Sequence, residues 1–190
     1  MSLRLCAYNI EWFDKAFTDD NRLSADAESK EQLAAIREVI THIDPDIIGI
    51  VEAPNHSAST GKSTVACLET FAQEAGLRVN EALMGFPSPG RQELAILFDP
   101  QKLSAEHEPG GEEGNTAHPR FDEEFRADTD DDRIKEVYKH YRPPLEVKLT
   151  RQDGGTELHL MVVHCKSKGI FSNTDRLHWL RETERNRRKL

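Results

Sequence analysis

Three polar residues whose side chains can bind a metal ion or a phosphate each stand at the end of a short apolar stretch. Asn9, Glu52 and His164 close residues 3–9, 46–52 and 158–164. Side chains alternate along a strand, so each polar residue is expected to face the same interior as the apolar residues of its parity. Those rows are Leu3, Leu5 and Ala7; Ile48 and Ile50; and Leu158, Leu160 and Val162. An ionised Glu52 would then need a metal, a cation or a proton, because an unpaired buried charge is costly.

The three stretches are predicted to be β-strands, and residues 47–52 read as a strand buried on both faces. Ligand sites in layered α/β structures lie at strand ends, so the three side chains converge if their strands are neighbours. The alternative is that each is an unrelated polar residue at the end of a strand.

The segments between these stretches alternate between helical and extended patterns. A helix is expected from Ser29, which forms a capping-box pair with Gln32, to the stop at Asp44–Pro45. A second helix is expected after an N-cap at Ser63 and ends at Gly76. The segment Gly61–Thr64 imitates a phosphate loop, but the first glycine of that motif is absent, so the motif is rejected.

Further strands are expected at 77–84, 93–98, from 103, and in a hairpin formed by 145–149 and 158–164. Residues 11–26 are interpreted as a loop at the rim of the pocket, residues 106–141 as an acidic loop or insertion, and a last helix is expected from about Asn173. The prediction is one domain over residues 1–190 with an α/β fold: a layered sandwich of two mixed β-sheets flanked by helices.

Composition is that of an ordinary globular protein, with 37% hydrophobic and 31% charged residues in a chain of 190. There is no run of about 20 apolar residues and no signal-peptide pattern, and Cys6, Cys67 and Cys165 are not spaced like metal ligands. A cytoplasmic location is therefore expected. The net charge of -9 argues against tight non-specific binding of nucleic acid, but it does not exclude a phosphorylated substrate or a polyanion approached through a metal. Oligomeric state is not predicted.

Five segments together resemble the endonuclease/exonuclease/phosphatase superfamily, which includes pancreatic deoxyribonuclease, abasic-site endonucleases, neutral sphingomyelinases and inositol-polyphosphate phosphatases. The segments are 5–12 (LCAYNIEW), 46–52 (DIIGIVE), 90–98 (GRQELAILF), 142–145 (RPPL) and 164–168 (HCKSK). Each is weak alone, but their order and spacing match the family across nearly the whole chain.

The resemblance implies a Mg²⁺-dependent phosphoesterase of the phosphodiesterase or nuclease type, with Mn²⁺ as a possible substitute. Glu52 would be a direct metal ligand, and Asn9 would position the metal or the phosphate. Arg142 would clamp the scissile phosphate, and His164 would contact the phosphate or its leaving oxygen. The implied reaction is in-line attack of water on a phosphoester.

The chain departs from the family in one respect. Members carry a Gly-Asp-x-Asn segment and a Ser-Asp-His segment that orient the attacking water, and neither occurs in these 190 residues. The resemblance therefore covers the first two thirds of the domain, and these residues alone are expected to be inactive. The alternative hypothesis is a non-catalytic phosphate-binding or interaction module. The substrate class, which spans DNA, RNA, lipid and inositol phosphates in the family, is left open.

Overall fold

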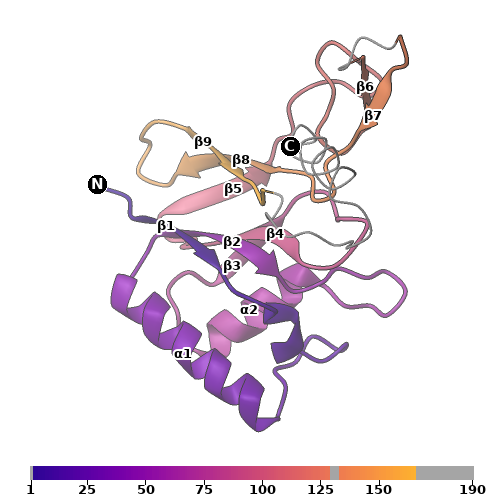
Figure 1. Cartoon of the computed structure of the whole chain (residues 1–190). Coiled ribbons are helices and arrows are strands. Elements are labelled where there is room, and N and C mark those ends of the chain that lie inside the picture. The colour runs from indigo at the N-terminus through magenta and orange to yellow at the C-terminus, as the bar shows by residue number, and fades with distance from the viewer. Residues whose placement is uncertain (1, 129–132, 166–190) are drawn as a thin grey trace.

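The computed structural model describes residues 2–128 and 133–165, which form two packed sheets with helices over one of them (Figure 1). The first sheet has the order β1-β2-β4-β3, the second β5-β8-β9, and a third consists of β6 and β7. The helices are η1 (Phe13–Ala16), α1 (Ala27–Ile43) and α2 (Thr64–Glu74). The strands are β1 (Leu5–Asn9), β2 (Ile47–Ala53), β3 (Glu81–Met84), β4 (Glu93–Phe98), β5 (Leu103–His107), β6 (Phe125–Ala127), β7 (Glu136–Tyr138), β8 (Leu145–Arg151) and β9 (Leu158–Val162).

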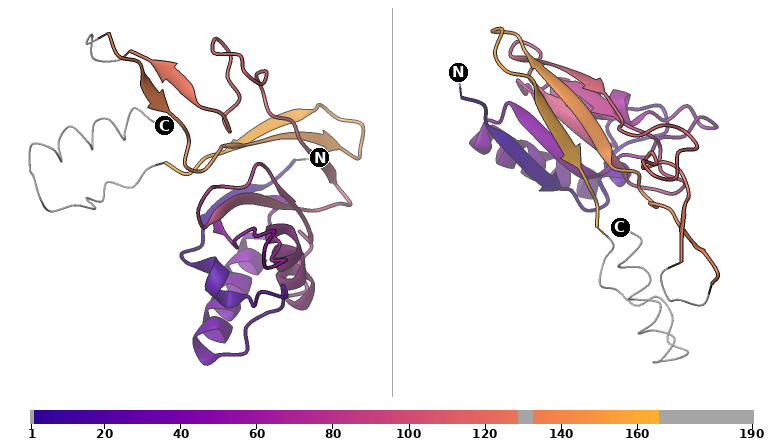
Figure 2. Two further views of the ribbon diagram at one scale, coloured as in Figure 1. Left: turned by 90° about the vertical axis from the view of Figure 1, so that its right-hand side faces the viewer. Right: turned by 90° about the horizontal axis from the view of Figure 1, so that it is seen from above.

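The predicted α/β sandwich is confirmed, and its layers explain the burial pattern of the central strands. The first sheet is mixed, because β1 runs parallel to β2 while β4 is antiparallel to β2 and to β3. The second sheet is antiparallel rather than mixed. One core lies between the first sheet and the helices, and another lies between the two sheets, so β2 and β4 are covered on both faces (Figure 2).

The two helices form where the apolar spacing predicts them, but α1 begins earlier than expected. Asp26, not Ser29, is its N-cap, and the Asp26 side chain accepts a hydrogen bond from the Ser29 N–H group. In α2 the predicted cap is confirmed, because the Ser63 side chain accepts a hydrogen bond from the Ala66 N–H group. Gly76 follows with a φ of +66°, as a helix terminus requires.

Three other expectations need correction. Residues 77–80 are not strand: the Leu77 N–H group bonds to the Ala72 carbonyl and completes the end of α2, so β3 begins at Glu81. Segment 11–26 is not only a rim loop, because Phe13 and Phe17 are buried in the core beneath the helices. Segment 106–141 contains β6 and β7, which extend away from the two sheets (Figure 1). The helix expected from about Asn173 lies outside the described residues.

A buried ionic network joins β2 and β4 at one end of the first sheet. Asp46 and Asp99 are 3% and 1% exposed, and the Asp99 N–H group donates to the Asp46 carbonyl. The Arg78 guanidinium pairs with Asp99 and, at 2.8 Å, with Asp46. The Lys102 ammonium also lies 2.6 Å from Asp46. Burial opposes ionisation of Asp46. The hydrogen bonds from Lys102, the Arg4 N–H group and Arg78 together outweigh this effect and lower the pKa of Asp46 to about 2.

Candidate active site

Glu52 sits on a β-bulge at the other end of β2. The register pairs Val51 with Leu94 and Ala53 with Glu93, which leaves Glu52 as an extra residue with a φ of +64°. Ala53 therefore faces the core beneath the helices in its place. The expectation that Glu52 points into that core with Ile48 and Ile50 is wrong, because the bulge changes the alternation and redirects the carboxylate.

The Glu52 carboxylate is held by two strained neighbours. Its Oε2 atom accepts hydrogen bonds from Gln92 Nε2 at 2.6 Å and from the Trp12 N–H group at 3.3 Å. Trp12 and Gln92 also have left-handed backbones, with φ values of 54° and 70°. Each such conformation costs a non-glycine residue roughly 1–3 kcal/mol, and such strain gathers at functional sites. Three strained residues in direct contact thus mark this end of the sheet as a candidate site.

Arg142 is bound to the same Gln92. Its Nε atom donates to the Gln92 carbonyl at 2.9 Å, and its Nη2 atom donates to Gln92 Oε1 at 2.7 Å. The guanidinium also stacks on the Tyr141 ring, 5.3 Å from its centroid. The following prolines are buried and lead into β8, which anchors Arg142 to the second sheet. One edge of the guanidinium is therefore used for positioning, and Nη1 makes no hydrogen bond to any described residue.

His164 follows β9 and lies close enough to the other two groups for their charges to affect it. Burial, and then the positive charge of Arg142, lower the pKa of His164, while Glu52 acts in the opposite direction. Its Nδ1 atom is buried without a hydrogen-bond partner among the described residues. The side chains predicted to be buried in the strand before His164 were Leu158, Leu160 and Val162. Val162 and Leu160 do pack in the core between the sheets, but Leu158 is 40% exposed. The lowered pKa favours the neutral imidazole, which has one nitrogen that can accept a hydrogen bond from a ligand.

Asn9 lies at the end of β1, paired in parallel register with Val51, the residue before Glu52. Its side chain is exposed and makes no hydrogen bond within the described residues. The predicted buried row holds for Leu3, which packs against the core between the sheets, but not for Leu5, which is 57% exposed, or for the exposed Ala7. In β1 it is Cys6 and Tyr8 that pack against the core beneath the helices. The strands of Asn9 and Glu52 are nevertheless neighbours, as the convergence hypothesis requires.

A chain of hydrogen bonds supports Gln92 from behind. The Gln92 N–H group donates to Asn55 Oδ1 at 2.7 Å, and the Asn55 N–H group donates to Asp14 Oδ1 at 2.9 Å. Asp14 in turn pairs at 2.8 Å with the ammonium of Lys62, which is 6% exposed. Lys62, part of the rejected phosphate-loop motif, thus belongs to the scaffold of the site.

Sequence reasoning assigned no role to Gln92 or Asn55. Gln92 directly precedes a recognisable strand, which was the available signal for a residue at the pocket edge. Its left-handed backbone and its two side-chain partners come from contacts distant in sequence, and no local pattern encodes them.

Glu93, the residue after Gln92, is a buried carboxyl group that holds the loop before β4. It is 1% exposed, and its Oε2 atom accepts a hydrogen bond from the Ser88 N–H group at 2.8 Å. Burial raises the pKa of Glu93, against the opposing effect of the hydrogen bond from Ser88.

The available donors fit a hard cation better than a soft one. No cluster of three or more His, Cys, Asp or Glu side chains that could hold a metal occurs among the described residues. Glu52 keeps Oε1 without a hydrogen bond to any described residue, and the Asn9 amide stands at the end of the adjacent strand. A single carboxylate with an amide oxygen fits Mg²⁺, which retains several waters, rather than Zn²⁺, which prefers a closed cage of His and Cys.

Comparisons with protein-family models, with curated proteins and with solved structures find no match to this chain. Within residues 2–128 and 133–165, no helix is long and apolar enough to cross a membrane.

Proposed function

We propose that this protein is a Mg²⁺-dependent phosphoester hydrolase of the endonuclease/exonuclease/phosphatase type. The observation that carries the proposal is that the Glu52 carboxylate and the Arg142 guanidinium are bound to the same Gln92 side chain, with the His164 imidazole near enough for both charges to affect its pKa. These groups come from β2, from the residues before β8 and from the residues after β9. These are complementary in charge to a phosphate and its counter-cation. The resemblance in five ordered sequence segments supports the same reaction class.

Each residue of the chain has a distinct task in this proposal. Arg142, held on one edge by Gln92, presents Nη1 to a non-bridging phosphoryl oxygen and stabilises its charge. His164, whose pKa is lowered by burial and by Arg142, donates or accepts a hydrogen bond at the phosphate or its leaving oxygen. Glu52 and Asn9 would hold Mg²⁺, which supplies Lewis-acid polarisation of the phosphoryl group.

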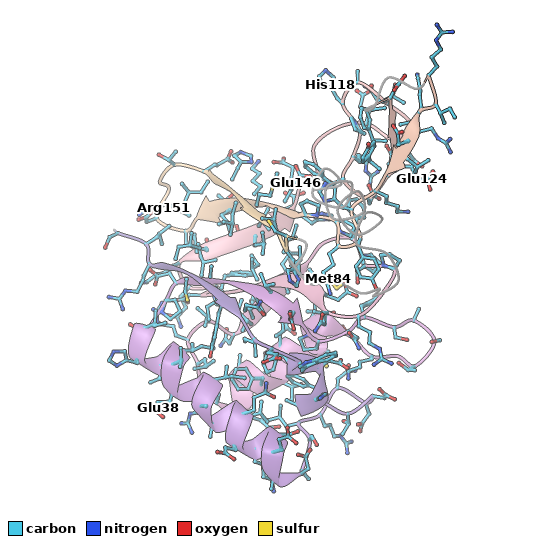
Figure 3. All side chains as sticks on the ribbon, in the orientation of Figure 1. Glu38, Met84, His118, Glu124, Glu146 and Arg151 are labelled. Carbon is cyan, nitrogen blue, oxygen red and sulfur yellow. The ribbon has the colours of Figure 1, made fainter. Side chains whose placement is uncertain are left out.

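The test is hydrolysis of bis(4-nitrophenyl) phosphate by the protein expressed from its complete reading frame, with Mg²⁺ and with EDTA. We expect turnover that requires the metal and falls by at least about a hundredfold in Glu52→Gln, since the carboxylate charge is removed at nearly constant volume. Glu38→Gln is the matched control, because Glu38 is exposed on α1, away from the two sheets (Figure 3). Activity in Glu52→Gln equal to that of the wild type would reject the metal assignment.

A parallel calorimetric titration separates the enzyme from a phosphate-binding module. Binding of inorganic phosphate in the presence of Mg²⁺, lost in Arg142→Ala but without turnover of any diester, would favour the module. Absence of both binding and turnover would reject the proposal.

A further inference from the structure

We propose that Gln92 is a positioning residue that fixes Glu52 and Arg142 relative to each other for phosphate binding. The role in phosphate binding rests on the proposed function, but the contacts from which it is inferred are seen in the structure whatever the function is. Gln92 bonds to both groups through its side chain, and it connects β2 of the first sheet with the segment that leads into β8 of the second.

The polarity of the amide explains why glutamine is suited to this position. The Arg142 guanidinium can only donate hydrogen bonds, and an ionised Glu52 can only accept them. The Gln92 carboxamide offers one acceptor to the first and one donor to the second, at 2.7 and 2.6 Å. An apolar side chain could serve neither partner, and a carboxylate would place a second negative charge against Glu52.

The main chain of Gln92 is fixed as firmly as its side chain. Its N–H group is bound to Asn55, and its carbonyl accepts from Arg142 Nε. The carbonyl and Oε1 together bind the Nε–Nη2 edge of the guanidinium, which restrains its rotation and leaves Nη1 without a hydrogen bond to any described residue. Gln92 therefore fixes the direction from which Arg142 meets a ligand, and it reaches no reacting atom itself.

The kinetic test is a double-mutant cycle with Gln92→Met and Arg142→Ala, measured as kcat/KM on bis(4-nitrophenyl) phosphate with Mg²⁺. Gln92→Met should lower kcat/KM by about 10- to 100-fold, the effect of losing one or two charge-assisted hydrogen bonds. In the Arg142→Ala background the same change should cost clearly less than in the wild type, because only the hydrogen bond to Glu52 remains to be lost. Gln73→Met, at an exposed position of α2, is the control. Equal losses in both backgrounds would overturn the proposal.

A second measurement needs neither turnover nor a Gln92 variant. The Nε–H resonance of Arg142, assigned by its disappearance in Arg142→Lys, should exchange with solvent at least about tenfold more slowly than that of Arg37, exposed on α1. Equal exchange rates in the wild type would overturn the positioning role. Slow exchange of the Arg142 Nε–H group in a protein without diesterase activity would reject the proposed function but would still support the positioning of Arg142 by Gln92.

Discussion

Replacement of Arg142 by lysine tests whether the geometry of the guanidinium, rather than its charge, is required. The arginine makes two hydrogen bonds to Gln92, at 2.9 Å from Nε and at 2.7 Å from Nη2, and keeps Nη1 for a ligand. A lysine ammonium is one point, so it can bind Gln92 or the phosphate but cannot hold this arrangement. At least one charge-assisted hydrogen bond is lost, worth about 1.5–3 kcal/mol.

That free energy predicts a loss of about 10- to 150-fold in kcat/KM for Arg142→Lys, since each 1.36 kcal/mol is a factor of ten. Arg142→Ala should lie within about tenfold of the lysine variant, because most of the effect is already lost. Initial rates on bis(4-nitrophenyl) phosphate at saturating Mg²⁺ give both values, with Arg37→Lys on α1 as the control. If Arg142→Lys keeps more than a third of the wild-type kcat/KM, the forked geometry is irrelevant and only positive charge matters.

Two predictions concern pH and stability. The pKa of Asp46 is lowered from 3.8 to about 2, so its ionic contribution is complete above pH 4 and is lost as pH falls through 2. Asp46→Asn should cost about 2 kcal/mol in urea unfolding at pH 7 and clearly less at pH 2.5; a constant difference would contradict the network's role. Burial raises the pKa of Glu93, so its protonated form is favoured in the fold and its stability contribution falls as pH rises past that pKa. The stability of Glu93→Gln relative to the wild type, measured by thermal unfolding, should therefore increase between pH 4 and pH 8; no relative increase would show that Glu93 ionises without penalty.

The layered fold follows from the sequence because its signals are local. Apolar spacing in α1, the Ser63 cap of α2 and the uninterrupted apolar run of β4 each determine their own element. The turn sequence Asp153-Gly154-Gly155 likewise predicts the hairpin of β8 and β9. Boundaries were less accurate where a neighbouring residue was a better cap, as Asp26 is for α1.

The site was predictable in its residue types but not in its geometry. Glu52, Asn9 and His164 could be identified as candidates because each is a polar residue at the end of a predicted apolar strand. Alternation then gave the wrong direction for Glu52, since a bulge depends on pairing between β2 and β4 that no local pattern reveals. Gln92 was missed for the same reason, because its role arises from partners 40 and 50 residues away.

The ionic network of Asp46 and the bulge of Glu52 occupy opposite ends of one strand, separated by six residues or roughly 20 Å. Effects of changes that far apart, without shared partners, are expected to add. The stability contribution of the Arg78–Asp99 end can therefore be changed without altering the contacts of Glu52. Along the length of β2 the fold thus places the buried ionic network at one end and the proposed site at the other, so changes at one end are expected to leave the other unaffected.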